Sequence, residues 1–186
     1  MGIDPGLARM GYASLKMEPP KITLLQCGLL TSSRDESTPR RLCSLYEGLT
    51  RVFEQMMPDE VAIEELFFEQ NVKTAMEVSQ ARGVALLVCG LFQKPVYEYK
   101  PVHVKQAVTG FGRATKDQIQ KMIRILLNLT KAPQPDDVAD AVALAWTHIQ
   151  MDKWQRERPD LGRNRMAIDV SLKPDRSVRI YRGEKA

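Results

Sequence analysis

Apolar residues follow two different periods along the first 150 residues. The short apolar stretches that predict strands are residues 1–3, 11–15, 22–30, 60–64 and 95–99. The longer stretches whose apolar residues recur at helical spacing are residues 39–57, 71–92, 101–108, 115–129 and 134–150. Several strands followed by an alternation of helix and strand predict an α/β domain with a mixed sheet.

The pattern changes near residue 151. Residues 151–165 are strongly charged, and the segments 167–172 and 177–181 alternate as the two strands of a hairpin do. We therefore expect a domain over residues 1–150 and a basic tail over residues 151–186, which forms either a β-hairpin or a partly disordered arm. The tail holds ten Lys or Arg against six Asp or Glu, which accounts for the whole net charge of +4.

Composition adds expectations about the class of protein. Apolar residues make up 44% and charged residues 27% of the 186 residues, as in ordinary globular proteins. No apolar run reaches the length of a membrane span, and the sequence opens on core-like residues rather than on a signal peptide, so we expect a cytoplasmic protein with no membrane partner. Cys27, Cys43 and Cys89 lie far apart among apolar neighbours, which predicts buried, reduced thiols.

Four acidic residues stand out because each lies in or beside an apolar run. They are Asp4 in Gly-Ile-Asp-Pro-Gly, Glu64 in Ala-Ile-Glu-Glu, and both Asp137 and Asp140 in Pro-Asp-Asp-Val-Ala-Asp-Ala. An ionised carboxylate is costly in apolar surroundings unless a cation compensates it. Carboxylates from distant core elements suggest a shared metal site, and oxygen ligands favour Mg²⁺ or Mn²⁺ over zinc. Sites of this kind that hold two ions mostly cleave or form phosphodiester bonds.

Each of these residues also has an ordinary structural explanation. Asp137 and Asp140 share one edge of a predicted helix, where Asp136 or Asp137 serves equally well as the N-cap. Asp-Pro-Gly is usually only a turn. Either Glu64 or Glu65 must point away from the site, because successive strand residues face opposite sides. The metal-site hypothesis therefore depends on the four acids occurring together.

Six stretches of the chain occur in an informative order over residues 1 to about 150. They are Gly-Ile-Asp-Pro-Gly-Leu-Ala-Arg-Met-Gly-Tyr, Ala-Ile-Glu-Glu-Leu-Phe-Phe, Gln-Ala-Arg-Gly-Val-Ala, Val-Lys-Gln-Ala-Val-Thr-Gly, Ala-Thr-Lys-Asp-Gln-Ile-Gln-Lys-Met and Asp-Asp-Val-Ala-Asp-Ala-Val-Ala-Leu-Ala. The set resembles the RuvC-type Holliday-junction resolvases, a family of the RNase H-like (retroviral-integrase) superfamily. The resemblance implies an RNase H-like α/β fold, in which helices flank a mixed five-stranded sheet, here followed by a C-terminal extension.

The resemblance further implies a metal-dependent endodeoxyribonuclease that makes paired symmetric nicks in four-way DNA junctions, in recombination and DNA repair. It makes Asp4, Glu64, Asp137 and Asp140 the catalytic, metal-binding acids, and it selects Glu64 over Glu65. Two Mg²⁺ ions, or Mn²⁺ in their place, are expected per active site, with Asp4 shared between the two ions.

Five more residues match positions that such resolvases use on DNA, or lie beside them. Phe67 matches the aromatic residue that stacks on a base near the junction, and Phe68 assists it. Lys105 and Lys116 match basic residues that meet the scissile region, and Arg113 follows the Gly-Phe-Gly loop between them. Without the resemblance, the two phenylalanines are better explained as core residues and the lysines as surface charges. His103 and His148 have no metal-ligand spacing to another His or Cys, so we expect both to be structural.

The expected partners are a four-way junction, a second copy of the chain, and the RuvA and RuvB branch-migration proteins. The helix at 71–92 is the expected dimer contact, since Ala75, Met76, Val78 and Val84 give it more than one apolar face. Three other functions stay open at this point. They are a junction-binding protein without activity, an RNase H-like nuclease acting on other structured nucleic acids, and an actin-like kinase or ATPase, which would need a second lobe.

Overall fold

The computed structural model describes residues 1–65, 72–157 and 167–168. Its strands are β1 (Gly2–Asp4), β2 (Arg9–Glu18), β3 (Lys21–Thr31), β4 (Val61–Glu64), β5 (Val96–Tyr99) and β6 (Ala167–Ile168). Its helices are α1 (Thr38–Met56), α2 (Val72–Leu91), α3 (Pro101–Thr109), α4 (Lys116–Leu126) and α5 (Asp136–Glu157). Every strand and helix predicted within residues 1–150 is present, and each lies at one of the apolar stretches of the sequence.

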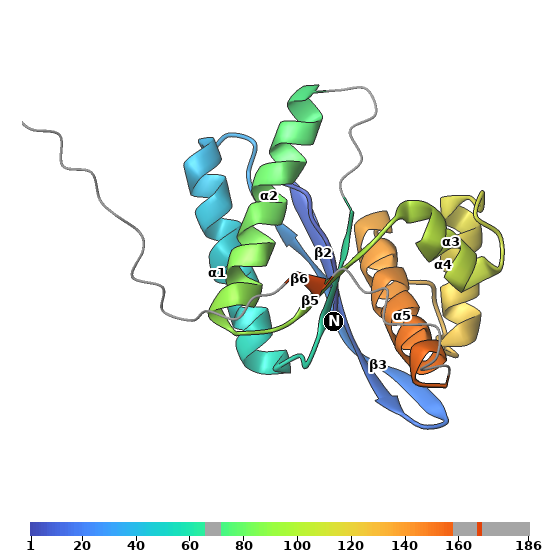
Figure 1. The fold of residues 1–186 in the computed structure, drawn as a ribbon. Coiled ribbons are helices and arrows are strands. Elements are labelled where there is room, and N and C mark those ends of the chain that lie inside the picture. The colour runs from blue at the N-terminus through green and yellow to red at the C-terminus, as the bar shows by residue number, and fades with distance from the viewer. Residues whose placement is uncertain (66–71, 158–166, 169–186) are drawn as a thin grey trace, which may run out of the picture.

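The strands form one mixed sheet in the order β3-β2-β1-β4-β5-β6. The long hairpin β2–β3 is antiparallel, whereas β1, β4 and β5 run parallel to one another. Helices α1 and α2 cover one face of the sheet, and α3, α4 and α5 cover the other (Figure 1). This confirms the expected α/β fold with a mixed five-stranded sheet, to whose edge β6 adds a short antiparallel strand.

Each face of the sheet has its own hydrophobic core. Between the sheet and helices α1 and α2, the largest fully buried side chains include Phe53, Leu45 and Leu49. On the other face, alanines of α5 pack directly against small residues of the sheet, such as Ala13 and Ala62. Small side chains bring a helix closer to a sheet than large ones do. Helix α5 therefore lies close against the sheet, which matters for the acidic residues that it carries.

Three elements are longer than their apolar patterns indicate. Strands β2 and β3 continue through polar residues to a turn at Pro19 and Pro20, because antiparallel pairing supplies the backbone hydrogen bonds. Helix α5 continues to Glu157 rather than ending at residue 150. Its last residues are charged, but neither glycine nor proline interrupts them, and charged long-chain residues are good helix formers. The division of the chain at 151 stays a prediction, and the expected strand at 177–181 lies outside the described residues.

The cysteines are less uniformly buried than expected. Cys89 is buried, Cys27 is partly exposed, and Cys43 is exposed on α1, so the expectation was wrong for Cys43 and only partly met by Cys27. Apolar neighbours in sequence did not predict burial there, because a helix turns adjacent residues to different faces. Among the described residues, none of the helices combines the length and apolar character needed to cross a bilayer.

Candidate active site

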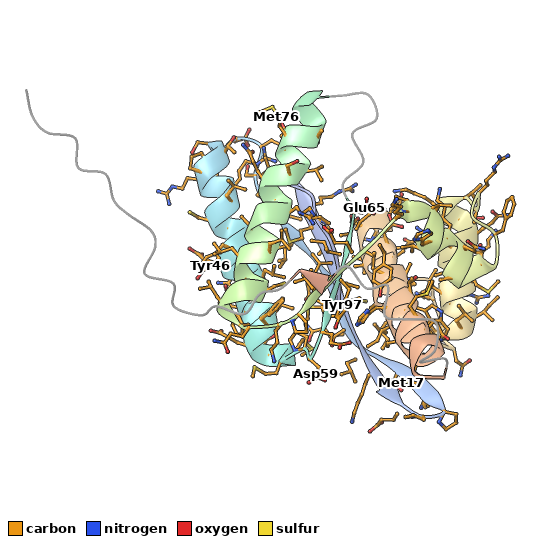
Figure 2. All side chains as sticks on the ribbon, in the orientation of Figure 1. Met17, Tyr46, Asp59, Glu65, Met76 and Tyr97 are labelled. Carbon is orange, nitrogen blue, oxygen red and sulfur yellow. The ribbon has the colours of Figure 1, made fainter. Side chains whose placement is uncertain are left out.

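Asp4 and Glu64 end two neighbouring parallel strands at the same edge of the sheet. Strands β1 and β4 pair with Ile3 opposite Ile63, so Asp4 and Glu64 stand level with each other one residue further on. Glu65 follows at the same end of β4, far from Asp59 at its other end (Figure 2). The strand register therefore brings together two acids that are 60 positions apart in sequence.

Two glycines allow the backbone of α5 to approach these strands. A Cβ atom on Gly11 of β2 would collide with the backbone carbonyl of Asp137. A Cβ atom on Gly2 of β1 would collide with the carbonyl of Ala141, one helical turn further on. Any other residue at either position would push the helix away from the sheet. This contact holds the first two turns of α5, with Asp137 and Asp140, next to the end of β1.

The four carboxylates are close enough to oppose one another's ionisation. Burial, and then the charges of the other three acids, raise the pKa of Asp4 to about 7. Burial and the charge of Asp140 also raise the pKa of Glu64. Burial raises the pKa of Asp140 as well, although Lys116 opposes the shift. Glu64 thus lies close enough to Asp140 for the two charges to interact, and the choice of Glu64 over Glu65 stays a prediction of the family resemblance.

Basic side chains compensate part of this negative charge. Arg9 Nε lies 3.2 Å from Asp137 Oδ2, and Lys116 Nζ lies 3.4 Å from Asp140 Oδ2. Although partial burial opposes the change, the carboxylates around Lys116, chiefly Asp140, raise its pKa. Lys105 also lies close enough to Glu64 to oppose part of the rise in its pKa that burial and Asp140 cause. The acidic group is therefore bordered by three cations, one at the start of β2 and two on α3 and α4.

The side chains fit a divalent cation in chemistry, although they do not form a closed set of ligands. The donors are carboxylate oxygens, which Mg²⁺ and Mn²⁺ prefer. Asp137 Oδ2 is buried and accepts no hydrogen bond of good geometry, and its ion pair with Arg9 occupies the position that a cation would take. Within residues 1–65, 72–157 and 167–168, no three acidic, His or Cys side chains converge on one point tightly enough to hold an ion as they stand. Arg9 and Lys116 instead hold Asp137 and Asp140.

The turn that follows Asp4 is held by residues that the sequence pattern did not reveal. Ser32 Oγ donates a hydrogen bond to the Leu7 carbonyl (2.6 Å), and Ser32 N–H donates to the Ala8 carbonyl (3.2 Å). Buried Arg41 on α1 donates through Nε to Ser32 Oγ (3.0 Å). These residues belong to a polar loop and a helix with no apparent relation to the acids. The role of Arg9 was missed as well, although it lies only five positions after Asp4.

Asp136 lies at the start of α5 and supports the acidic group through contacts with α4. Its Oδ1 accepts a hydrogen bond from Gln120 Nε2 of α4 (2.8 Å), and its Oδ2 lies 3.8 Å from Lys116 Nζ. Both contacts connect α4 to α5. The start of α4 is fixed in turn by a capping box, in which Thr115 and Gln118 exchange hydrogen bonds. The position of Lys116 is thus set both by the capping box of its own helix and by its contacts with Asp136 and Asp140.

The residues expected to contact DNA divide into two groups. Lys105, Arg113 and Lys116 border the acidic group or the loop beside it, and Arg113 is exposed. Phe67 and Phe68 lie outside the described residues.

His148 is buried and structural, as expected. Its Nδ1 lies 2.7 Å from the Tyr99 hydroxyl, and its Nε2 lies 2.7 Å from Glu60 Oε2. These partners fix the ring between α5 and the sheet. His103, by contrast, is exposed on α3 and does not belong to the buried core.

Comparisons with known proteins agree on one family. The family described as "Crossover junction endodeoxyribonuclease RuvC" matches residues 1–148. A protein of that name from Alkaliphilus metalliredigens is 50% identical over 155 residues, which cover 83% of this chain and 94% of the relative. The one from Roseiflexus sp. is 51% identical over 148 residues, 80% of this chain and 88% of the relative.

Solved structures agree with this assignment. Thermus thermophilus RuvC in complex with a Holliday junction substrate superimposes with a TM-score of 0.78 at 34% identity, over 82% of this chain and 93% of that one. The yeast mitochondrial Holliday junction resolvase Ydc2 has a TM-score of 0.63 at 13% identity, over 86% and 82% of the two chains. At 13% identity, the similarity to Ydc2 supports the fold alone.

Proposed function

The chain belongs to the RuvC family of crossover junction endodeoxyribonucleases, and on that premise we propose that it resolves four-way DNA junctions by making paired symmetric nicks in recombination and repair. The observation that carries the proposal is the meeting of four carboxylates at one end of the sheet, beside Lys105 and Lys116. Carboxylates supply metal ligands, and the lysines supply charge for a phosphate backbone. The T. thermophilus relative, solved with a Holliday junction substrate, supports a four-way junction as the substrate.

Asp4, Glu64, Asp137 and Asp140 are the residues that would hold Mg²⁺ or Mn²⁺. Asp4 is the candidate for a ligand shared by two ions, because it ends β1 where the other three carboxylates are all close enough for their charges to act on it. When bound, such ions activate water and stabilise the charge on the attacking and leaving oxygens of a phosphodiester. The raised pKa values of Asp4, Glu64 and Asp140 support the assignment, because a cation relieves this repulsion.

The basic residues bind and orient the DNA in this proposal. Lys116 and Lys105 lie beside the acids on two different helices, so they can hold a backbone phosphate between the carboxylates and themselves. Arg9 and Lys116 compensate Asp137 and Asp140 in the protein by itself. Once a metal ion neutralises the carboxylates, the side chains of Arg9 and Lys116 are free to contact a DNA phosphate instead. Arg113 extends the positive surface along the loop between α3 and α4, and Phe67 with Phe68 is proposed to stack on a junction base.

A homodimer with one active site per protomer completes the proposal, since a two-fold substrate suits a two-fold protein. Met76, Leu87 and Leu91 of α2 are exposed and share one face of the helix with Gly83, where an added Cβ atom would meet no neighbouring element within 4 Å. Figure 2 shows Met76 at the end of α2 away from the sheet. Val84, by contrast, packs against the monomer's own core, so it does not belong to this face. We also propose action in the cytoplasm together with RuvA and RuvB.

The test is cleavage of a synthetic four-way junction with a mobile core in the presence of Mg²⁺. We expect two nicks at symmetric positions in strands of like polarity, mapped at nucleotide resolution, and much slower cleavage of a linear duplex, a hairpin and an RNA–DNA hybrid of matched sequence. Asp4→Asn should bind the junction without nicking it. Binding without nicking by the unaltered protein, in Mg²⁺ and in Mn²⁺, would identify a non-catalytic binder. Equal cleavage of the control substrates would identify a nuclease of different specificity.

A further inference from the structure

Phe111 projects an aromatic ring into solvent from the loop between α3 and α4. Its side chain is 58% exposed, and among the described residues it is the single aromatic member of the exposed large hydrophobic side chains. Single exposed apolar side chains are common on protein surfaces, but an aromatic ring in solvent also offers a flat face on which another ring can stack. Phe111 is not among the residues that the family resemblance implies for DNA contact. The aromatic residues expected to stack are Phe67 and Phe68.

Hydrogen bonds fix the backbone of the loop that carries the ring. Thr109 Oγ1 accepts a hydrogen bond from Phe111 N–H (3.1 Å) and lies within donating distance of the carbonyls of Lys105 (2.8 Å) and Phe111 (3.0 Å). Ala114 N–H donates to the Phe111 carbonyl (3.2 Å). A Cβ atom on Gly112 would meet Val102 Cγ2 at 2.9 Å, so the loop backbone lies against α3. An exposed aromatic on a fixed backbone loses little entropy when it binds.

The charges beside this loop identify the chemistry of the partner. Lys105 precedes the loop on α3 and acts on Glu64, and Lys116 follows it on α4, 3.4 Å from Asp140. Arg113, which is exposed, lies two positions after Phe111. The ring therefore lies on a loop whose two flanking helices carry cations to the acidic site. An exposed ring beside several cations fits a partner that has both negative charge and flat apolar groups. Single-stranded or unpaired nucleic acid has both, in its phosphates and its bases.

We propose that Phe111 stacks on an unpaired nucleobase of the bound four-way junction, as a second aromatic contact separate from Phe67 and Phe68. The inference rests on the proposed function for the identity of the DNA. Stacking by the ring positions a strand along α3 and α4 toward the carboxylates, and it tolerates any base because every base has an aromatic face. Phe111 is thus a positioning residue, which holds DNA without touching the bond that breaks.

The experiment measures junction binding and base unstacking without cleavage. Four-way junctions carrying 2-aminopurine at single positions around the crossover are titrated with the full-length protein in EDTA and in Ca²⁺, and binding is followed by anisotropy. The variants are Phe111→Ala, Phe111→Leu and Phe111→Trp, with Ile125→Ala as the matched control. Ile125 is also exposed, at 63%, but it lies near the opposite end of α4.

Phe111→Ala is expected to weaken junction binding by about 5- to 150-fold, the equivalent of one lost base–aromatic stack, and to abolish the 2-aminopurine signal at one position. Phe111→Trp should restore both readings, whereas Phe111→Leu should not. The slope of log Kd against log salt should be unchanged in Phe111→Ala, because stacking neutralises no phosphate, but should fall by about one in Arg113→Ala. Ile125→Ala should match the unaltered protein.

The outcomes separate this inference from the proposed function. If the unaltered protein binds and nicks the junction but Phe111→Ala gives the same affinity and 2-aminopurine signals, the stacking inference is wrong and the proposed function stands. Phe111→Leu behaving like the unaltered protein would also overturn it, since an apolar group without a ring would then suffice. If the unaltered protein shows no preference for the junction over linear duplex, the proposed function fails, and the inference fails with it.

Discussion

Replacing Asp4 by Asn should make the metal-free protein more stable while removing its activity. The side chain keeps its size but can no longer ionise among three other carboxylates. The pKa of Asp4 is raised from 3.8 to about 7. Since a shift of one unit is worth 1.36 kcal/mol, the ionised Asp4 costs the folded protein up to about 4 kcal/mol. This is an upper value, because neighbouring groups relax when the charge is present.

The sign and the pH range follow from the direction of the shift. A carboxyl group whose pKa is raised by folding contributes its full stability below the unfolded pKa, and this contribution is lost as the pH rises through the folded pKa. The loss therefore occurs between about pH 4 and pH 7 in the unaltered protein and is absent from Asp4→Asn. The advantage of the variant should grow from about 1.5 kcal/mol at pH 5 to about 4 kcal/mol at pH 8.

Urea unfolding in EDTA at pH 5, 6, 7 and 8 measures this difference, with equal m-values as the check that the unfolded states are comparable. Asp35→Asn is the control, because it removes the charge of an aspartate in an exposed loop outside the acidic group. Added Mg²⁺ should raise the stability of the unaltered protein more than that of Asp4→Asn. A variant that is less stable than the unaltered protein at pH 8 in EDTA would refute the account of mutual repulsion at this site.

Two further predictions concern packing and assembly. Gly11→Ala should destabilise the protein by about 1–3 kcal/mol or more in urea unfolding, because the new methyl group collides with the Asp137 carbonyl, and should slow junction nicking by displacing α5. Gly90→Ala is the control, at a helical glycine with no neighbouring element close by, and should leave stability unchanged or raise it by up to about 1 kcal/mol. Equal effects of Gly11→Ala and Gly90→Ala would contradict the close approach of β2 to the backbone of α5. Leu87→Glu should shift the protein from dimer to monomer in sedimentation, whereas Leu25→Glu, at an equally exposed leucine on β3, should not. A Leu87→Glu protein that stays dimeric would place the dimer contact elsewhere.

The order and type of the elements could be predicted because hydrophobic periodicity is a local property. Strand β4 and helix α1 each show their period within their own residues, and tertiary contacts confirm it. The end of α5 was not predictable in this way. Its charged last turns show no apolar stripe, and only the continuous backbone of the helix reveals that it extends to Glu157.

The acidic residues illustrate the same distinction within the site. Asp4, Glu64, Asp137 and Asp140 attract notice in the sequence because charges beside apolar runs are costly. Period alone left Glu64 and Glu65 equivalent, and the strand register together with the charge of Asp140 favours Glu64. Ser32 and Arg41 could not be linked to Asp4 from the sequence, since nothing local marks a hydrogen bond to a turn 25 residues away.

The sequence by itself determined where strands and helices form, and it singled out four acids beside apolar runs as candidates for one shared site. The tertiary structure alone decided that these acids meet, that Gly2 and Gly11 admit the backbone of α5, and that Arg9 and Lys116 compensate the charge. The physical reason is range. Periodicity and capping act over a few residues, whereas electrostatic repulsion and steric fit act between groups that only folding brings together.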